Sequence, residues 1–286
     1  MKVKGVQPFM ENIKVKKQWI TYKGTNICFQ AYKEPLDSNK PYMIFIHGFL
    51  SSQYSFRKMI PLLIEKYNIV TIDLPPFGDS DRLTRFKYSY VNLANIIIYF
   101  MNTKSISQAY LVGHSMGGQI ALTCAYHYPE RIRKLILLAP CSYLSKADRF
   151  SYLISWLPFF PYLLKGLLYR KGVYETLRQC VYNESIISKG MLKTYIKPFL
   201  DNAIYLCLTK MIRDREGDLD SECLATIEIQ SYIFWGKKDE ILPISIAYHL
   251  VRDLPRAELC TFDFAGHLLP EEVPNVICER ILDECN

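Results

Sequence analysis

A glycine-rich turn around Ser115 is the segment of this sequence best suited to nucleophilic chemistry. Gly113-His114-Ser115-Met116-Gly117-Gly118 follows an apolar run at 109–112 and precedes a stretch with helical spacing. Glycines two residues before and two after the serine allow a strand-to-helix turn in which larger side chains would collide with backbone. Such a turn places the Ser115 hydroxyl at the carboxyl end of a sheet, beside the first N–H groups of a helix. The pattern predicts that Ser115 is a nucleophile.

A serine hydroxyl is a weak nucleophile and needs a base. His267 follows the expected strand at 258–264 by a short Ala265-Gly266 turn, so it should reach the carboxyl edge of the sheet. The other histidines lie within other motifs or on expected helices: His47, His114, His127 and His249. His267 is therefore the predicted base.

The base in turn needs a carboxylate that orients it. Asp239 follows the expected strand at 229–234 and should lie at the same edge of the sheet. Asp263 and Glu240 are rival acids, but Asp263 is expected inside a strand and Glu240 is expected to point elsewhere along its loop. Asp239 then completes the chain order serine, acid, histidine that a triad built on such a turn requires.

The loop after the apolar run at 42–46 is expected to supply part of an oxyanion hole. His47-Gly48-Phe49 stands there, and the backbone N–H groups of Phe49 and Met116 are the predicted donors. His47 is expected to brace this loop rather than to catalyse. No metal-ligand spacing occurs in the chain, so neither a metal nor an organic cofactor is expected.

Composition limits the class of protein. The chain has 286 residues, of which 50% are hydrophobic, so it can bury a large core. Its net charge of +7 is concentrated in the first forty residues, which favours a solvated face or, alternatively, contact with an anionic membrane surface. No arginine-rich run or nucleic-acid motif is present, so no nucleic-acid partner is expected.

Nine scattered cysteines without a C-x-x-C pair indicate reduced thiols. The sequence shows neither a signal peptide nor an apolar stretch long enough to span a membrane, so a cytoplasmic location is expected. The sequence does not indicate an oligomeric state.

Short apolar runs alternate with helical segments along most of the chain. After a hairpin around residues 23–25, strands are expected at 42–46, 68–74, 109–112, 134–139, 229–235 and 258–264. Helical spacing lies between them at 54–67, 92–101 and 119–128. Continuous apolar strands of this kind suit a parallel sheet covered on both faces, which is the α/β class.

The stretch 141–227 breaks this alternation because it contains helical segments without a convincing strand. It is too long for a simple loop. We therefore expect a core domain made of residues 1–140 and 228–286, with residues 141–227 inserted as a helical cap after the sixth strand.

Five motifs in this order resemble the α/β-hydrolase superfamily: IHGF at 46–49, DLPPFGDSD at 73–81, GHSMGG at 113–118, WGKKDEILP at 235–243 and AGHLLPEE at 265–272. The resemblance implies the α/β-hydrolase fold, with a mostly parallel eight-stranded sheet flanked by helices, a Ser-Asp-His triad and a cap over the pocket. Serine at the nucleophile position argues against haloalkane dehalogenases and epoxide hydrolases, which carry aspartate there. Leu268 stands where carbon–carbon bond hydrolases often carry tryptophan, which weakens that subclass.

The segment 150–164 is unusually apolar for an insertion. It is expected either to line the substrate pocket or to pack between cap helices. A third interpretation is that it rests on a membrane together with the basic N-terminus.

The favoured function is a carboxylesterase that cleaves small to medium apolar esters through an acyl-enzyme. Carbon–carbon bond hydrolysis or cofactor-free peroxidation with the same triad are alternatives. A non-catalytic receptor for a small ligand is a third.

Overall fold

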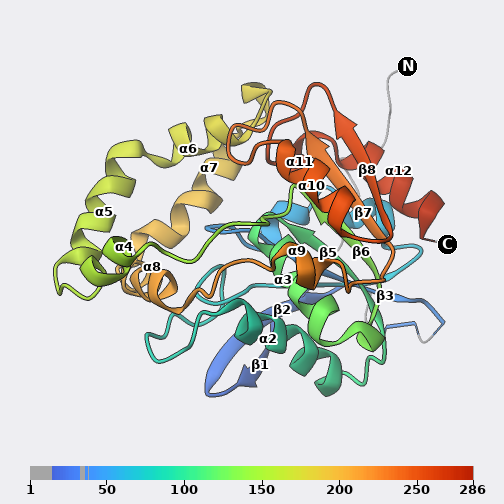
Figure 1. Ribbon diagram of the computed structural model, residues 1–286, viewed down its shortest axis with the longest axis horizontal. Coiled ribbons are helices and arrows are strands. Elements are labelled where there is room, and N and C mark those ends of the chain that lie inside the picture. The colour runs from blue at the N-terminus through green and yellow to red at the C-terminus, as the bar shows by residue number, and fades with distance from the viewer. Residues whose placement is uncertain (1–14, 33–35, 38, 286) are drawn as a thin grey trace.

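The computed structural model describes residues 15–32, 36–37 and 39–285 and confirms the α/β-hydrolase fold. A single eight-stranded sheet has the strand order β1-β2-β4-β3-β5-β6-β7-β8 (Figure 1). The strands are β1 (Gln18–Tyr22), β2 (Thr25–Ala31), β3 (Tyr42–Ile46), β4 (Asn68–Ile72), β5 (Ala109–His114), β6 (Ile132–Leu138), β7 (Ser231–Gly236) and β8 (Ala257–Phe262).

The sheet is mostly parallel. The antiparallel part is the hairpin β1–β2 and the pairing of β2 with β4, while β4, β3, β5, β6, β7 and β8 pair in parallel. The predicted hairpin around residues 23–25 is confirmed. Its first strand, which the sequence predicts over residues 13–22, begins at Gln18, and residues 13 and 14 lie outside the described residues.

Helices cover both faces of the sheet, which explains why its central strands are continuously apolar. Every residue of β4 and β5 is buried. The helix α3 (Met116–His127) packs on β3, β5 and β6 and contacts α2 (Tyr90–Thr103). The other helices of the core are α1 (Ile60–Leu63), which contacts α12 (Pro274–Glu284), and α9 (Ser221–Leu224), α10 (Ser245–Asp253) and α11 (Leu269–Glu272).

The expected helix over residues 54–67 is wrong in its length. The structure has the 3₁₀ helix η2 (Gln53–Phe56) and then the four-residue helix α1. Pro61 stands in the first turn of α1 and cannot donate a backbone hydrogen bond to the preceding turn. It therefore marks the start of a new helix rather than the middle of a long one.

Between β6 and β7 the described chain forms helices only. They are α4 (Arg149–Ile154), α5 (Phe160–Lys171), α6 (Val173–Cys180), η4 (Glu184–Ile186), α7 (Lys189–Ile196), η5 (Lys197–Leu200) and α8 (Ala203–Asp214), followed by α9. Figure 1 shows α4 to α8 projecting to the left of the sheet. We refer to α4–α8 as the inserted helices.

The nine cysteines are all free thiols, so no disulfide supports this fold. Within the described residues, no helix has both the length and the apolar character needed to cross a bilayer.

Candidate active site

The loops that follow five parallel strands open at one edge of the sheet. Ile46 pairs with Gly113, Leu138 with Phe234, and Gly236 with Phe262, so β3, β5, β6, β7 and β8 end close together. The three residues predicted to form a triad stand on the loops after β5, β7 and β8. The topology therefore brings segments more than a hundred residues apart in sequence to one edge.

The turn at Ser115 has the tight geometry that the sequence predicted. Ser115 has φ 53° and ψ −120°, a conformation that L-residues rarely adopt. A Cβ on Gly117 would lie 2.0 Å from the carbonyl oxygen of Ile46, and a Cβ on Gly113 would lie 2.5 Å from the carbonyl oxygen of Gly117. Both positions therefore exclude any side chain, and Ser115 is held directly at the start of α3.

His267 and Asp239 form a direct hydrogen bond. Nδ1 of His267 lies 2.7 Å from Oδ2 of Asp239, and both side chains are almost fully buried. The other carboxylate oxygen of Asp239 accepts hydrogen bonds from the N–H groups of Ile241 (2.8 Å) and Leu242 (2.9 Å). These donors fix the carboxylate, which in turn orients the imidazole with Nδ1 as the donor.

The two rival acids lie elsewhere. β8 ends at Phe262, so the expectation that Asp263 stands inside a strand is wrong. Asp263 instead forms an exposed ion pair with Lys237 at 2.6 Å. Glu240 is exposed to solvent. Of the three acids, Asp239 alone contacts His267.

The hydroxyl of Ser115 lies beside a thiol in this structure. Its Oγ is 3.6 Å from Sγ of Cys141, a residue that the sequence analysis did not single out. Burial raises the pKa of Cys141 to about 11, so the group is a neutral thiol at neutral pH.

The predicted oxyanion donors stand next to Ser115. Gly48, which precedes Phe49, approaches Ser115 so closely that a Cβ on it would lie 3.1 Å from the serine Cβ. Met116 is the first residue of α3, so its N–H has no acceptor within the helix. Within the described chain, no backbone hydrogen bond from the N–H of Phe49 or of Met116 is present.

His47 braces the first of these loops, as expected. Its Nε2 accepts a hydrogen bond from the N–H of Leu74 at 2.9 Å, and its Nδ1 donates to the carbonyl of Gly48 at 2.8 Å. Burial lowers the pKa of His47, so the ring is neutral and suited to this pairing.

His114 supports the backbone of His267, a role that the sequence analysis did not foresee. Its Nε2 donates to the carbonyl of His267 at 2.9 Å, and the two rings lie 5.0 Å apart. Burial, together with the nearby His267, lowers the pKa of His114 to about 3. The ring is therefore a neutral donor that holds the backbone of His267.

The inserted helices also hold the loop that carries His267. The carbonyl of Cys180, at the end of α6, accepts hydrogen bonds from the N–H groups of His267 (2.8 Å) and Leu268 (2.9 Å). The carboxylate of Glu272 accepts from the N–H groups of Gly266 (2.7 Å), Tyr182 (2.8 Å) and Asn183 (3.1 Å). Glu272 lies in the AGHLLPEE motif, so the sequence offered a reason to consider it. The contact of Cys180 uses its main-chain carbonyl, which every residue has, so the sequence could not reveal it.

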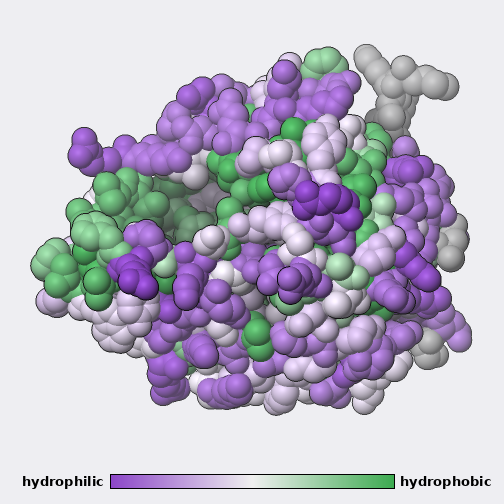
Figure 2. All heavy atoms as spheres, in the orientation of Figure 1, coloured by the Kyte–Doolittle hydropathy of each residue, from purple (hydrophilic) through white to green (hydrophobic). Residues whose placement is uncertain are grey.

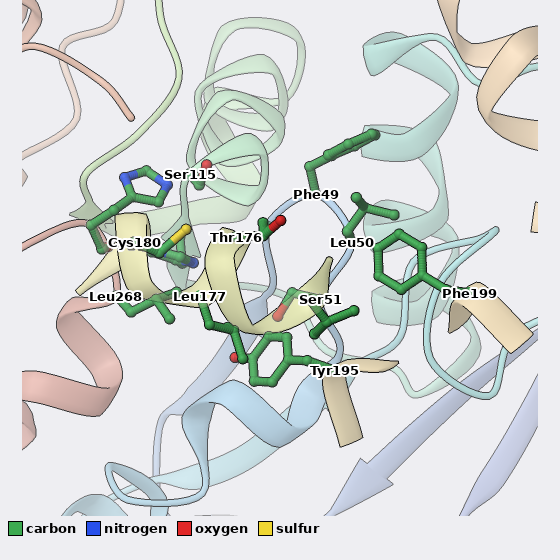
Figure 3. Close-up of a pocket in the computed structure, with 14 residues that line it drawn as sticks. Phe49, Leu50, Ser51, Ser115, Thr176, Leu177, Cys180, Tyr195, Phe199 and Leu268 are labelled. Carbon is green, nitrogen blue, oxygen red and sulfur yellow. Dashed lines mark hydrogen bonds between the residues drawn. The ribbon is translucent and has the colours of Figure 1, made fainter. Parts of the chain in front are cut away.

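A pocket of about 80 Å³ lies between Ser115 and the inserted helices. Its lining is largely apolar and includes Phe49, Leu50, Leu177, Phe199 and Leu268 (Figure 3). The hydroxyls of Ser51 and Tyr195 lie next to each other there and are buried without a hydrogen bond of normal geometry to any described residue.

Of the three interpretations of residues 150–164, the one in which they line this pocket is wrong. The lining residues from the insertion come from α6, α7 and η5. In contrast, many side chains of α4, of α5 and of the turn between them are exposed to solvent, among them Phe150, Trp156 and Tyr162.

One group of potential metal ligands occurs within the described residues. It contains Cys28, Asp73 and Asp79. The carboxylate of Asp73 already accepts hydrogen bonds from Gln53 and from the N–H of Asp79, and Asp79 pairs with Lys17 and Lys197. The side chains thus satisfy one another without an ion.

Comparisons with known proteins agree with this architecture. A family model described as the alpha/beta hydrolase fold matches residues 41–179. The uncharacterized hydrolase YugF of Bacillus subtilis (strain 168) is 40% identical over 263 residues, which are 92% of this chain and 95% of that protein. This chain therefore belongs to the α/β-hydrolase fold family, and the protein is a hydrolase.

More distant relatives have named substrates. The 2-hydroxy-6-oxo-6-phenylhexa-2,4-dienoate hydrolase of Burkholderia cepacia is 27% identical over 227 residues, 74% of each chain. The solved structure of a hydrolase of the same name from Rhodococcus sp. strain RHA1 matches with a TM-score of 0.77 at 21% identity and covers 95% of this chain and 98% of that one. That likeness shows the shared fold.

Proposed function

We propose that the protein is a serine hydrolase that cleaves small to medium apolar carboxylic esters through an acyl-enzyme. The observation that carries the proposal is the hydrogen bond between His267 and Asp239 beside the constrained turn of Ser115, at the mouth of an apolar pocket. A fixed imidazole next to a serine at a helix start is the arrangement that acyl transfer uses.

In the proposed reaction, Ser115 Oγ attacks the ester carbonyl while Nε2 of His267 takes the hydroxyl proton. The N–H groups of Phe49 and Met116 stabilise the oxyanion of the tetrahedral intermediate. Its collapse breaks the bond to the alkoxy group, which leaves as an alcohol with the proton from His267. Water then attacks the acyl-enzyme with His267 as base, and the acid is released.

Asp239 keeps Nδ1 protonated and stabilises the imidazolium that forms in each step. The inserted helices act as the cap of this proposed site, because α6, α7 and η5 close the pocket over Ser115. The small volume of the pocket favours short acyl groups, and longer chains must displace side chains of the cap.

Carbon–carbon bond hydrolysis is the second candidate, and the named dienoate hydrolases among the relatives support it. Those dienoates carry a carboxylate, which needs a cation when it leaves water. Among the described residues that line the pocket there is no lysine or arginine. We therefore place ester hydrolysis first.

The test compares p-nitrophenyl esters from acetate to decanoate with 2-hydroxy-6-oxo-6-phenylhexa-2,4-dienoate. Ser115→Ala and His267→Ala are each expected to lower ester kcat by about 10⁶-fold, and Asp239→Asn by about 10⁴-fold. Cys141→Ala is the control and should retain activity within a few-fold, although the Cys141 thiol contacts the Ser115 hydroxyl. Faster turnover of the dienoate than of any ester would reject the esterase assignment in favour of the second candidate.

A further inference from the structure

A broad apolar surface covers α4, α5 and the turn between them. Its exposed large hydrophobic side chains are Phe150, Tyr152, Leu153, Trp156, Leu157, Phe159, Tyr162, Leu163, Leu167 and Tyr169. Figure 2 shows this area in green at the left of the molecule, over the part that Figure 1 labels α4 and α5. Apolar patches of this extent on a folded chain mark sites of interaction. We call it the α4–α5 surface.

A basic hollow of about 470 Å³ adjoins the α4–α5 surface. Its cationic lining residues are Lys146, Arg149, Arg213 and Arg215, and its described lining includes no carboxylate. Within the described chain, the first three form no ion pair, while Arg215 pairs with Asp218 at 3.5 Å. Unpaired guanidinium groups that share one hollow are suited to bind a phosphate group.

The hollow and the apolar surface share residues. Tyr152 and Leu153 belong to both. The guanidinium of Arg213 lies over the ring of Trp156, 4.4 Å from its centroid. An occupant that fills the hollow therefore also covers the aromatic side chains.

The charge around the surface identifies the occupant. Residues 146–172 contain five basic side chains and a single acid, Asp148. The carboxylate of Asp148 is engaged at the start of α4, where it accepts hydrogen bonds from the N–H groups of Phe150 and Ser151. A second copy of this chain, related by a two-fold axis, would bring these cations against one another. An anionic lipid surface would instead complement them.

We propose that the α4–α5 surface docks on a bilayer that contains anionic phospholipids. A lipid phosphate occupies the basic hollow, and the aromatic side chains enter the boundary between headgroups and acyl chains, where Trp and Tyr are favoured. The exposed lysines and arginines extend to the headgroups. This docking is independent of the proposed reaction. It can therefore be tested by measuring how the protein binds to vesicles, without an activity assay.

The test is cosedimentation with phosphatidylcholine vesicles that contain or lack phosphatidylglycerol. We expect binding to the anionic vesicles that decreases steeply as salt is added. Trp156→Ala and the double variant Arg149→Gln/Arg213→Gln should each weaken this binding by about tenfold or more. The matched controls are Trp19→Ala on β1, where the side chain is 53% exposed against 61% for Trp156, and Arg256→Gln, an exposed arginine outside the surface; both should bind as the wild type.

Tryptophan fluorescence gives a second readout. Trp235 is fully buried, so in a Trp19→Phe background Trp156 is the exposed reporter, and its emission should shift to shorter wavelength on anionic vesicles. Equal binding to both kinds of vesicle, or binding unaffected by the surface variants, would overturn the proposal. So would occupation of the hollow by inorganic phosphate without vesicle binding, or a dimer in lipid-free buffer that Trp156→Ala dissociates.

Discussion

The carbonyl of Cys180 accepts a 2.8 Å hydrogen bond from the backbone N–H of His267. The proposed base is thus held by a residue of the inserted helices as well as by the core. This bond joins the end of α6 directly to the backbone of His267. The inserted helices therefore hold the proposed base in addition to shaping the pocket.

Glu272 should strengthen this connection between α6 and the loop of His267. Its carboxylate accepts hydrogen bonds from the N–H of Gly266 in that loop and from the N–H groups of Tyr182 and Asn183, which follow α6. In Glu272→Gln one acceptor oxygen becomes an amide donor that faces these N–H groups. We expect a loss of about 1.5–3 kcal/mol in the free energy of unfolding and a fall of about tenfold or more in kcat/KM as His267 shifts. Urea unfolding and ester kinetics measure the two effects. Glu279→Gln, exposed on α12, is the control, and equal behaviour of the two variants would contradict the role of Glu272.

His114 should make stability depend on pH. Burial lowers its pKa to about 3 from an ordinary value of 6.5, so between these values the unfolded chain binds more protons than the folded one. Stability is therefore fully present above about pH 6.5 and is lost as the pH falls towards 3, by up to about 1.4 kcal/mol per pH unit for this group. The free energy of unfolding should be measured at about pH 5 and about pH 7. It should change less between these values in His114→Gln than in the wild type, and the glutamine keeps a donor for the His267 carbonyl. The exposed His127→Gln should keep the wild-type slope.

Two glycine substitutions should change the stability of the protein in opposite directions. Gly117→Ala places a methyl group 2.0 Å from the Ile46 carbonyl oxygen, whereas a Cβ on Gly166 in α5 meets no atom within 4 Å. We expect Gly117→Ala to cost more than about 4 kcal/mol and to abolish activity. Gly166→Ala should stabilise the chain by about 0.5–1 kcal/mol. Thermal unfolding of both variants measures this contrast, and an active Gly117→Ala enzyme would contradict the geometry described for the turn.

The hydroxyl of Tyr195 should contribute nothing to stability, because it is buried beside Ser51 without a normal hydrogen bond to a described residue. Tyr195→Phe should therefore leave the free energy of unfolding unchanged or raise it, and it should improve kcat/KM for purely apolar esters. Tyr205→Phe removes the same atom from a buried ring, but there the hydroxyl donates to the Phe199 carbonyl at 3.0 Å. That variant should lose about 1 kcal/mol. Equal losses in urea unfolding would show that Tyr195 has a partner.

The sheet could be predicted from the sequence because its central strands are buried on both faces and therefore read as continuous apolar runs. The turn at Ser115 and the loops of Asp239 and His267 could be predicted for the same reason, since each directly follows such a strand. The face of the inserted helices that meets the pocket could not be predicted, because α4 and α5 are apolar on sides that remain exposed. The contacts of His267 with Cys180 and His114 could not be predicted from the sequence either, because they are made by the main-chain N–H and carbonyl of His267.

The left-handed backbone of Ser115 has a consequence for how this chain can evolve. A non-glycine residue in a sparsely populated conformation costs about 1–3 kcal/mol, and glycine at the same place would be relieved of that cost. Ser115→Gly should therefore melt at a higher temperature than the wild type while lacking its nucleophile. Selection for heat resistance alone would favour an inert descendant, and the serine persists only where turnover itself is under selection.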